Sequence, residues 1–156
     1  MVLIIAYGNS LRRDDGAGLV LAELLEEALR ANGLEITRVA VHQLTPDLAL
    51  SVAADDVEAV VFVDTRVAAA GDEPLELLAC PLVSSLDSPT LGHQLGPSTL
   101  LTYARLLYRK SPPAWLLTVP GVDFDHGEGL SDATRHALDT LPDLLRKLPP
   151  AWPLNP

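Results

Sequence analysis

Two kinds of segment alternate along the chain: short runs that are almost entirely apolar, and longer segments whose apolar residues recur every three or four positions. Residues 2–7 and 59–63 are of the first kind, which is typical of strands buried on both faces of a sheet. Residues 16–31 are of the second kind, and their spacing predicts an amphipathic helix. Strands that alternate with helices predict an α/β fold with a mostly parallel sheet.

The alternation extends over nearly the whole chain. Strands are expected at 2–7, 35–41, 59–63, 75–79 and 114–119. Helices are expected at 16–31, at 46–54 with Thr45 as its cap, at 97–109, and after Ser131 with a break or kink at Pro142. We therefore predict one three-layer α/β domain over residues 1–148, with helices on both faces of the sheet. Residues 149–156 are rich in proline and are expected to form a tail.

Composition narrows the possible partners. The chain has 156 residues, with 11 Lys and Arg against 21 Asp and Glu, and a formal net charge of −10. Neither nucleic acid nor an anionic membrane surface is expected to bind so acidic a chain. No run approaches the roughly 20 apolar residues of a membrane-spanning helix, and residues 1–7 lack the basic start of a signal peptide. The single cysteine, Cys80, is expected to be a buried apolar residue in a reducing, cytoplasmic setting.

The turn after the first strand carries an unusual set of residues. Three glycines, Gly8, Gly16 and Gly18, flank two adjacent carboxylates, Asp14 and Asp15. Glycine lets the backbone come close to another segment, and a carboxylate at a helix N-terminus is favoured by the helix dipole. We assign Asp14 to local capping or support, and Asp15 to function. The turn has neither the glycine spacing of a dinucleotide site nor the lysine of a P-loop.

Two further polar residues are expected at the same edge of the sheet. Asp64 directly follows the apolar run 59–63, and the carboxyl ends of parallel strands meet at one edge. His93 lies in a glycine-flanked loop before the helix at 97–109, and this placement brings it towards the same edge. Two carboxylates and an imidazole in a cleft suit a divalent transition metal, and they suit general acid–base hydrolysis equally well.

The other histidines carry weaker signals. His42 follows the second strand, from which it can reach the same rim. His126 stands among acidic residues that can border a cation site, although a solvated acidic loop explains them more simply. His136 lies within the last helix and is expected to serve packing or to lie at the surface. The roles of His42 and His126 stay open, and no serine-nucleophile motif is present.

Three motifs together resemble those of a known family. Residues 8–18 read Gly-Asn-x-Leu-x-x-Asp-Asp-Gly-x-Gly, residues 63–64 read Val-Asp, and residues 92–96 read Gly-His-Gln-Leu-Gly. Their order and spacing resemble the hydrogenase maturation proteases, which trim the large subunit of nickel–iron hydrogenases. The resemblance covers nearly the whole domain. One departure is visible, because the family often has Gly-x-Gly-Asn where this chain has Ala6-Tyr7-Gly8-Asn9, and Tyr7 can alter the cleft.

The resemblance implies a five-stranded sheet flanked by helices, and action in the cytoplasm. It implies that Asp15, Asp64 and His93 form the metal-recognition and catalytic set of an aspartyl-type endopeptidase. The metal is then nickel, supplied by the precursor large subunit rather than tightly resident, and cleavage removes the C-terminal extension of that precursor. Which carboxylate is the general base, and whether the metal polarises the scissile carbonyl or only positions the precursor, stay open.

Two other classes of function fit the same residues. A non-catalytic metal-binding or chaperone-like maturation module on this fold can hold or check nickel without cutting anything, because fold does not fix function. A small-molecule hydrolase that uses the acidic turn is the other alternative. A deep, enclosed pocket would favour this hydrolase, and an open groove suited to a peptide would favour an endopeptidase.

Overall fold

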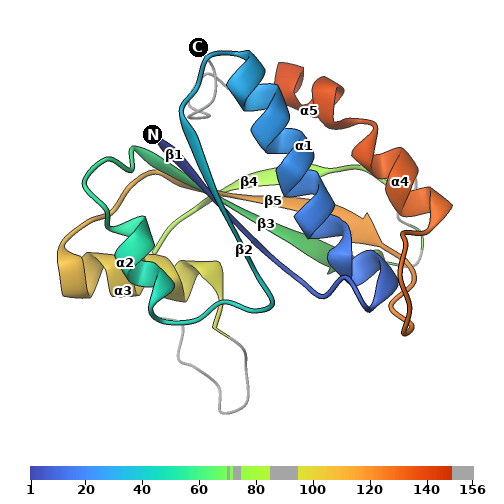
Figure 1. The fold of residues 1–156 in the computed structure, drawn as a ribbon, viewed down its shortest axis with the longest axis horizontal. Helices are drawn as coiled ribbons and strands as arrows, with labels where there is room; N and C mark the ends of the chain where they lie inside the picture. Colours follow the sequence, from blue (N-terminus) through green and yellow to red (C-terminus); the bar gives the residue numbers. More distant parts are fainter. Residues whose placement is uncertain (70, 72–74, 85–94, 149–156) are drawn as a thin grey trace.

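The computed structural model describes residues 1–69, 71, 75–84 and 95–148, and in these residues a five-stranded sheet forms the centre of the molecule (Figure 1). The strands are β1 (Val2–Tyr7), β2 (Ile36–Val41), β3 (Ala59–Val67), β4 (Leu78–Leu82) and β5 (Ala114–Gly121). Their order across the sheet is β2-β1-β3-β5-β4. The pairs β1–β2, β1–β3 and β3–β5 are parallel, whereas β4 runs antiparallel to β5. The sheet is therefore mixed, with one antiparallel edge strand.

Helices pack against this sheet in two groups. They are α1 (Ala17–Ala31), α2 (Leu48–Val52), α3 (Pro97–Tyr108), α4 (Asp132–Leu138) and α5 (Leu141–Lys147), and a 3-10 helix, η1 (Arg13–Gly16), precedes α1. Figure 1 shows α1, α4 and α5 on one side of the sheet and α2 and α3 on the other. No helix formed by the described residues is long and apolar enough to cross a membrane.

Successive residues of β1 pack into two different parts of the core. Val2, Ile4 and Ala6 belong to a cluster that contains buried residues of α1, α4 and α5. Leu3 and Ile5 belong to a second cluster that contains buried residues of α2 and α3. Because successive side chains of a strand point to opposite faces, a strand covered on both faces must be apolar throughout. This requirement explains the unbroken apolar run at the start of the chain.

The structure corrects several of the expected boundaries. The third strand does not stop at residue 63 but continues to Val67, since Asp64 to Val67 pair with β5. The fourth strand lies at Leu78–Leu82 rather than at 75–79. The side chain of Thr45 caps no helix, because α2 begins only at Leu48 and has Asp47 at its N-cap position.

The end of the chain and the cysteine also differ in detail from the prediction. The last helical region is broken into α4 and α5 at Asp139–Thr140, and Pro142 lies in the first turn of α5 rather than at the break. Ser131 caps α4 as predicted, because its side chain accepts a hydrogen bond from the Thr134 N–H. Cys80 is exposed rather than buried, since it lies on the edge strand β4. The predicted tail, residues 149–156, lies outside the described residues.

Candidate active site at the carboxyl ends of β1 and β3

The candidate site lies where β1 ends beside its neighbour β3. The chain leaves β1 through α1 and returns to the sheet as β2, which pairs with one side of β1. β3 pairs with the other side of β1, and its own far side pairs with β5. In open α/β sheets, the crevice between two strands whose connections diverge is the usual place for a ligand. The predicted residues Asp15 and Asp64 come from the two segments that border this crevice.

Asp15 is held by the turn that follows β1. Its Oδ2 accepts a hydrogen bond from the Asn9 N–H at 3.0 Å, and no described residue donates to its Oδ1. Gly8 makes this compact turn possible, because a Cβ at that position would lie 2.2 Å from the Asp15 carbonyl oxygen and its φ is +154°. A side chain at residue 8 would therefore displace the backbone that carries Asp15.

Asp64 lies half-buried within β3, directly beneath the start of α1. The Thr65 N–H donates to its Oδ1 at 2.7 Å. A Cβ at Gly18 would lie 3.0 Å from the Asp64 carbonyl carbon, so only glycine lets α1 begin this close to β3. The Gly18 N–H also donates to the Thr65 hydroxyl at 2.9 Å. These contacts fix the start of α1, and with it Asp15, over Asp64.

Asp15 and Asp64 are close enough for their charges to interact. Burial raises the pKa of Asp64, and the charge of Asp15 raises it further, although hydrogen bonds from Thr65 and Tyr7 act in the opposite direction. Because the two carboxylates repel each other, a cation or a shared proton between them lowers the electrostatic free energy of the site. The structure thus places two of the three predicted site residues together.

His93, the third predicted residue, lies outside the described residues. The described chain resumes at Leu95, which packs against the second core cluster, as does Tyr7. Among the described residues, no group of three or more His, Cys, Asp or Glu side chains is arranged to hold a metal ion. The assignment of His93 therefore stays a prediction.

Tyr7, the visible departure from the family pattern, adjoins Asp64. Burial, followed by the charge of Asp64 and a hydrogen bond to it, raises the pKa of Tyr7. The hydroxyl is thus protonated at neutral pH and available as a donor to the carboxylate. Sequence comparison with the family pattern singled out Tyr7, but only the structure shows which residue it contacts.

A Tyr7→Phe substitution is expected to raise the pKa of Asp64 further, because the hydrogen bond that it removes favours the charged carboxylate. NMR titration of the Asp64 carboxyl carbon measures this pKa directly. Tyr103→Phe is the matched control, since Tyr103 also packs against the second core cluster but is not among the groups that shift the pKa of Asp64. A lower or unchanged pKa in Tyr7→Phe would contradict the described role of the hydroxyl.

Asp14 supports the turn, as one of the two predicted roles had it, but it does so through distant residues and not as a local cap. Its fully buried carboxylate accepts hydrogen bonds from the N–H groups of Val122 (2.9 Å), Asp123 (3.0 Å) and Ser131 (2.8 Å). The hydroxyls of Ser131 (2.8 Å) and Thr134 (2.9 Å) also donate to it. Asp14 therefore connects the turn after β1 to the loop after β5 and to the start of α4.

These hydrogen bonds also decide the charge of Asp14. Burial alone would raise the pKa of Asp14, but donation from Ser131, Val122 and Asp123 outweighs it and lowers the pKa to about 2. Arg13 strengthens the same connection, because its guanidinium lies 3.3 Å from the Asp123 carboxylate. The turn that carries Asp15 is thus anchored to a segment more than 100 residues away in sequence.

The remaining histidines do not join the two carboxylates. His42, His126 and His136 are all exposed. His42 lines a hollow of about 300 Å³ beside the turn, on the β2 side of β1, together with Gly8, Asn9, Ser10, Leu11, Leu19, Ala40 and Val41. Neither Asp15 nor Asp64 lines this hollow. The described residues therefore give no direct link between His42 and the carboxylate pair.

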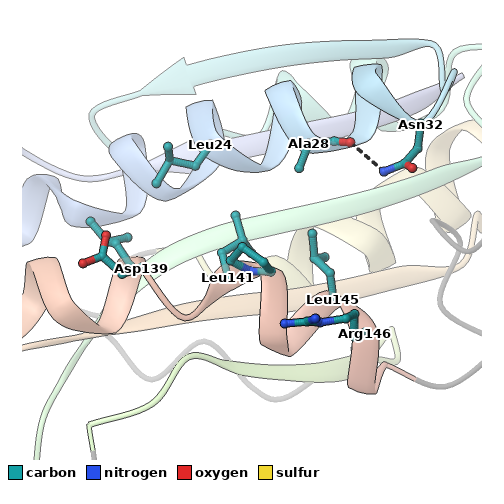
Figure 2. A pocket seen from close by; sticks show the side chains of 9 residues that line it. Leu24, Ala28, Asn32, Asp139, Leu141, Leu145 and Arg146 are labelled. Atoms are coloured by element: carbon teal, nitrogen blue, oxygen red, sulfur yellow. Dashed lines mark hydrogen bonds between the residues drawn. The ribbon is translucent and has the colours of Figure 1, made fainter.

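A larger apolar groove lies away from the candidate site, between α1 and the α4–α5 segment. Figure 2 shows Leu24 on α1 opposite Leu141 and Leu145 on α5. The groove has a volume of about 660 Å³, and neither Asp15 nor Asp64 lines it. This groove is therefore separate from the chemistry of the carboxylate pair.

Comparisons with known proteins identify the fold. No family model matches the chain, and a search of curated proteins found no match. Among solved structures, the nickel–iron hydrogenase maturation protease HybD from Thermococcus kodakarensis is 22% identical, with a TM-score of 0.63 over 94% of this chain and 97% of that one. An endopeptidase from Escherichia coli is 18% identical, with a TM-score of 0.65 over 93% of this chain and 90% of that one.

A third structure, the hydrogenase maturating endopeptidase HybD from E. coli, is 17% identical, with a TM-score of 0.56 over 93% of this chain and 91% of that one. The chain thus has the fold of the hydrogenase maturation proteases over nearly its whole length. The five-stranded sheet implied by the sequence resemblance is confirmed.

Proposed function

We propose that this protein is an endopeptidase that recognises nickel in the precursor large subunit of a nickel–iron hydrogenase and removes its C-terminal extension. The observation that carries the proposal is the pair of interacting carboxylates, Asp15 and Asp64, in the crevice between β1 and β3. The pair occurs on a fold shared with proteins that are named hydrogenase maturation proteases.

The chemistry of the donor set fits a metal held by the substrate. Asp15 and Asp64 supply oxygen ligands, and His93 supplies an imidazole nitrogen, which together suit a divalent transition metal with open coordination positions. Because the two carboxylates repel each other, binding of a cation between them is electrostatically favourable. The Oδ1 of Asp15, to which no described residue donates, is the natural ligand atom of that residue.

Asp64 is the better candidate for the general base. Burial and the charge of Asp15 raise its pKa, so its carboxylate holds an abstracted proton more readily than an ordinary aspartate does. In the proposed step, Asp64 takes a proton from a water molecule as the oxygen attacks the scissile carbonyl carbon. The C–N bond then breaks, and the proton passes from Asp64 to the leaving amine.

The proposed substrate is a protein, and the proposed setting is the cytoplasm. The hollow beside the turn is small and does not enclose the carboxylates, which favours a macromolecular substrate over a small molecule.

Incubation with nickel-loaded and nickel-free precursor tests the proposal. We expect mass spectrometry to show that the loaded large subunit loses a C-terminal fragment and that the nickel-free subunit keeps its mass. The expected difference follows from ligation of the substrate's nickel by Asp15, Asp64 and His93. His93→Ala is expected to bind the loaded precursor more weakly than wild type, because one ligand is removed.

Three other outcomes have distinct meanings. If the loaded precursor is not trimmed, the endopeptidase proposal fails. Nickel-dependent association without any change in precursor mass would identify a non-catalytic maturation module. Equal trimming of loaded and nickel-free precursor would support the peptidase activity and contradict nickel recognition.

A further inference from the structure

Strand β3 extends beyond its neighbour β1 at the candidate site. Pairing between β1 and β3 ends at Ala6 and Val63, whereas pairing between β3 and β5 continues to Val67. Within the part of the chain that the structure describes, the last residues of β3 therefore have a strand on one side only. This overhang starts at Asp64, the proposed general base.

The directions of the backbone groups identify which of them lie on the open side. The N–H of Val60 donates to Pro113 on the β5 side at 2.9 Å, and the N–H of Ala68 donates to Gly121 there at 2.9 Å. Because backbone groups alternate along a strand, the N–H and C=O groups of even-numbered residues face β5. Those of Thr65 and Val67 face the side on which β1 has ended.

Most of the groups on this open edge have no partner within the described residues. The Thr65 N–H is bonded to the Asp64 carboxylate at 2.7 Å. No described residue forms a hydrogen bond with the Thr65 C=O or with the N–H and C=O of Val67. Val67 itself is 74% exposed.

We infer that an extended segment of the substrate polypeptide pairs with the open edge of β3 at Thr65–Val67, which places the scissile bond at Asp64 and Asp15. The inference rests on the proposed function and adds the way in which the substrate binds. Alternating donors and acceptors on an open strand edge are complementary to a peptide backbone, and strand addition is a common mode of peptide recognition.

The chemistry and length of the edge favour a short peptide over a second copy of this chain. Only the last part of β3 is open, because the rest of the strand is paired on both sides. An edge of this length offers few hydrogen bonds, whereas stable association of two proteins needs roughly 1,200 Å² or more of buried surface. For a substrate segment that passes Asp64, the same few hydrogen bonds are enough to set its register relative to the two carboxylates.

Val67→Pro tests the inference, because proline removes the N–H on the open edge and leaves the β5-facing groups of Arg66 and Ala68 in place. The expected result is a fall of about 5- to 10-fold in kcat/KM for the loaded precursor, mainly through KM, which corresponds to one lost hydrogen bond. Val83→Pro is the matched control, since it is the same change at another exposed valine outside the site. Val67→Ala, which keeps the N–H, must lose less than Val67→Pro.

A binding measurement tests the edge independently of cleavage. Amide hydrogen exchange at Val67 is expected to slow when the nickel-loaded precursor is added to wild-type protein. If wild type trims the precursor but Val67→Pro retains full kcat/KM, strand addition is overturned and the proposed function stands. Unchanged amide exchange at Val67 in the presence of bound precursor also overturns strand addition by the substrate. The same holds if light scattering shows that the protein alone is a dimer and the Val67 amide already exchanges slowly in that dimer.

Discussion

Asp64→Asn is expected to reduce the rate of trimming of the loaded precursor by about 10³-fold, within the range that general-base catalysis contributes. Asparagine keeps the size of the side chain and an oxygen that can accept the Thr65 N–H, so the end of β3 keeps its local structure. It removes the carboxylate that takes the proton from water. The loss is therefore expected in kcat rather than in the stability of the fold.

The pH dependence gives a second readout of the same group. The base acts only when deprotonated, so the wild-type rate is expected to rise with pH through the pKa that Asp64 has in the complex with the loaded precursor, where the charge of the proposed nickel ion opposes the raising effects of burial and of the Asp15 charge. The residual activity of Asp64→Asn should not show this rise with pH. Asp139→Asn is the matched control, because Asp139 is an exposed aspartate in the separate α1–α5 groove. Full activity in an Asp15→Asn, Asp64→Asn double variant would contradict the assignment of this site.

The buried parts of the fold could be predicted from the sequence because the physical requirement there is simple. A strand covered on both faces must be apolar at every position, and β1 matches its predicted range to the residue. The extension of β3 could not be predicted in this way. Asp64, Thr65 and Arg66 are polar, and only pairing with β5, more than 50 residues away in sequence, makes them strand residues.

The edge of the sheet was also harder to predict than its centre. β4 contains Cys80 and Pro81, and among the described residues it pairs with β5 alone, so neither an apolar run nor a clear alternation marks it. The exposure of Cys80 has the same cause, since an edge strand is less completely covered than a central one.

The candidate site was predictable where it depends on topology. Parallel strands bring their carboxyl ends to one edge, which is why Asp15 and Asp64 could be paired from their positions in the sequence. The role of Asp14 depends instead on a loop far along the chain. Its partners Val122, Asp123 and Ser131 have no local pattern that points back to the turn.

Asp14→Ala is expected to lower the free energy of unfolding by about 4 kcal/mol, because it leaves several buried donors without an acceptor. Three backbone N–H groups and two hydroxyls donate to this one carboxylate. Such a loss is a large share of the 5–15 kcal/mol that typically stabilises a domain. Urea denaturation measures it. Asp15→Ala is the matched control, because among the described residues the Asp15 carboxylate accepts a hydrogen bond from the Asn9 N–H alone, so its removal should cost much less.

The charge of Asp14 makes part of this stability dependent on pH. The folded pKa of about 2 lies below the ordinary value of 3.8, so the charged form favours folding. The linked contribution is about 2 kcal/mol. It is fully present well above the ordinary pKa and is lost as the pH falls through that value towards 2. Wild type should therefore lose this stability in acid, whereas Asp14→Asn should lack this component of the pH dependence. Parallel pH curves for the two proteins would mean that Asp14 is not the anchor between the turn and the loop.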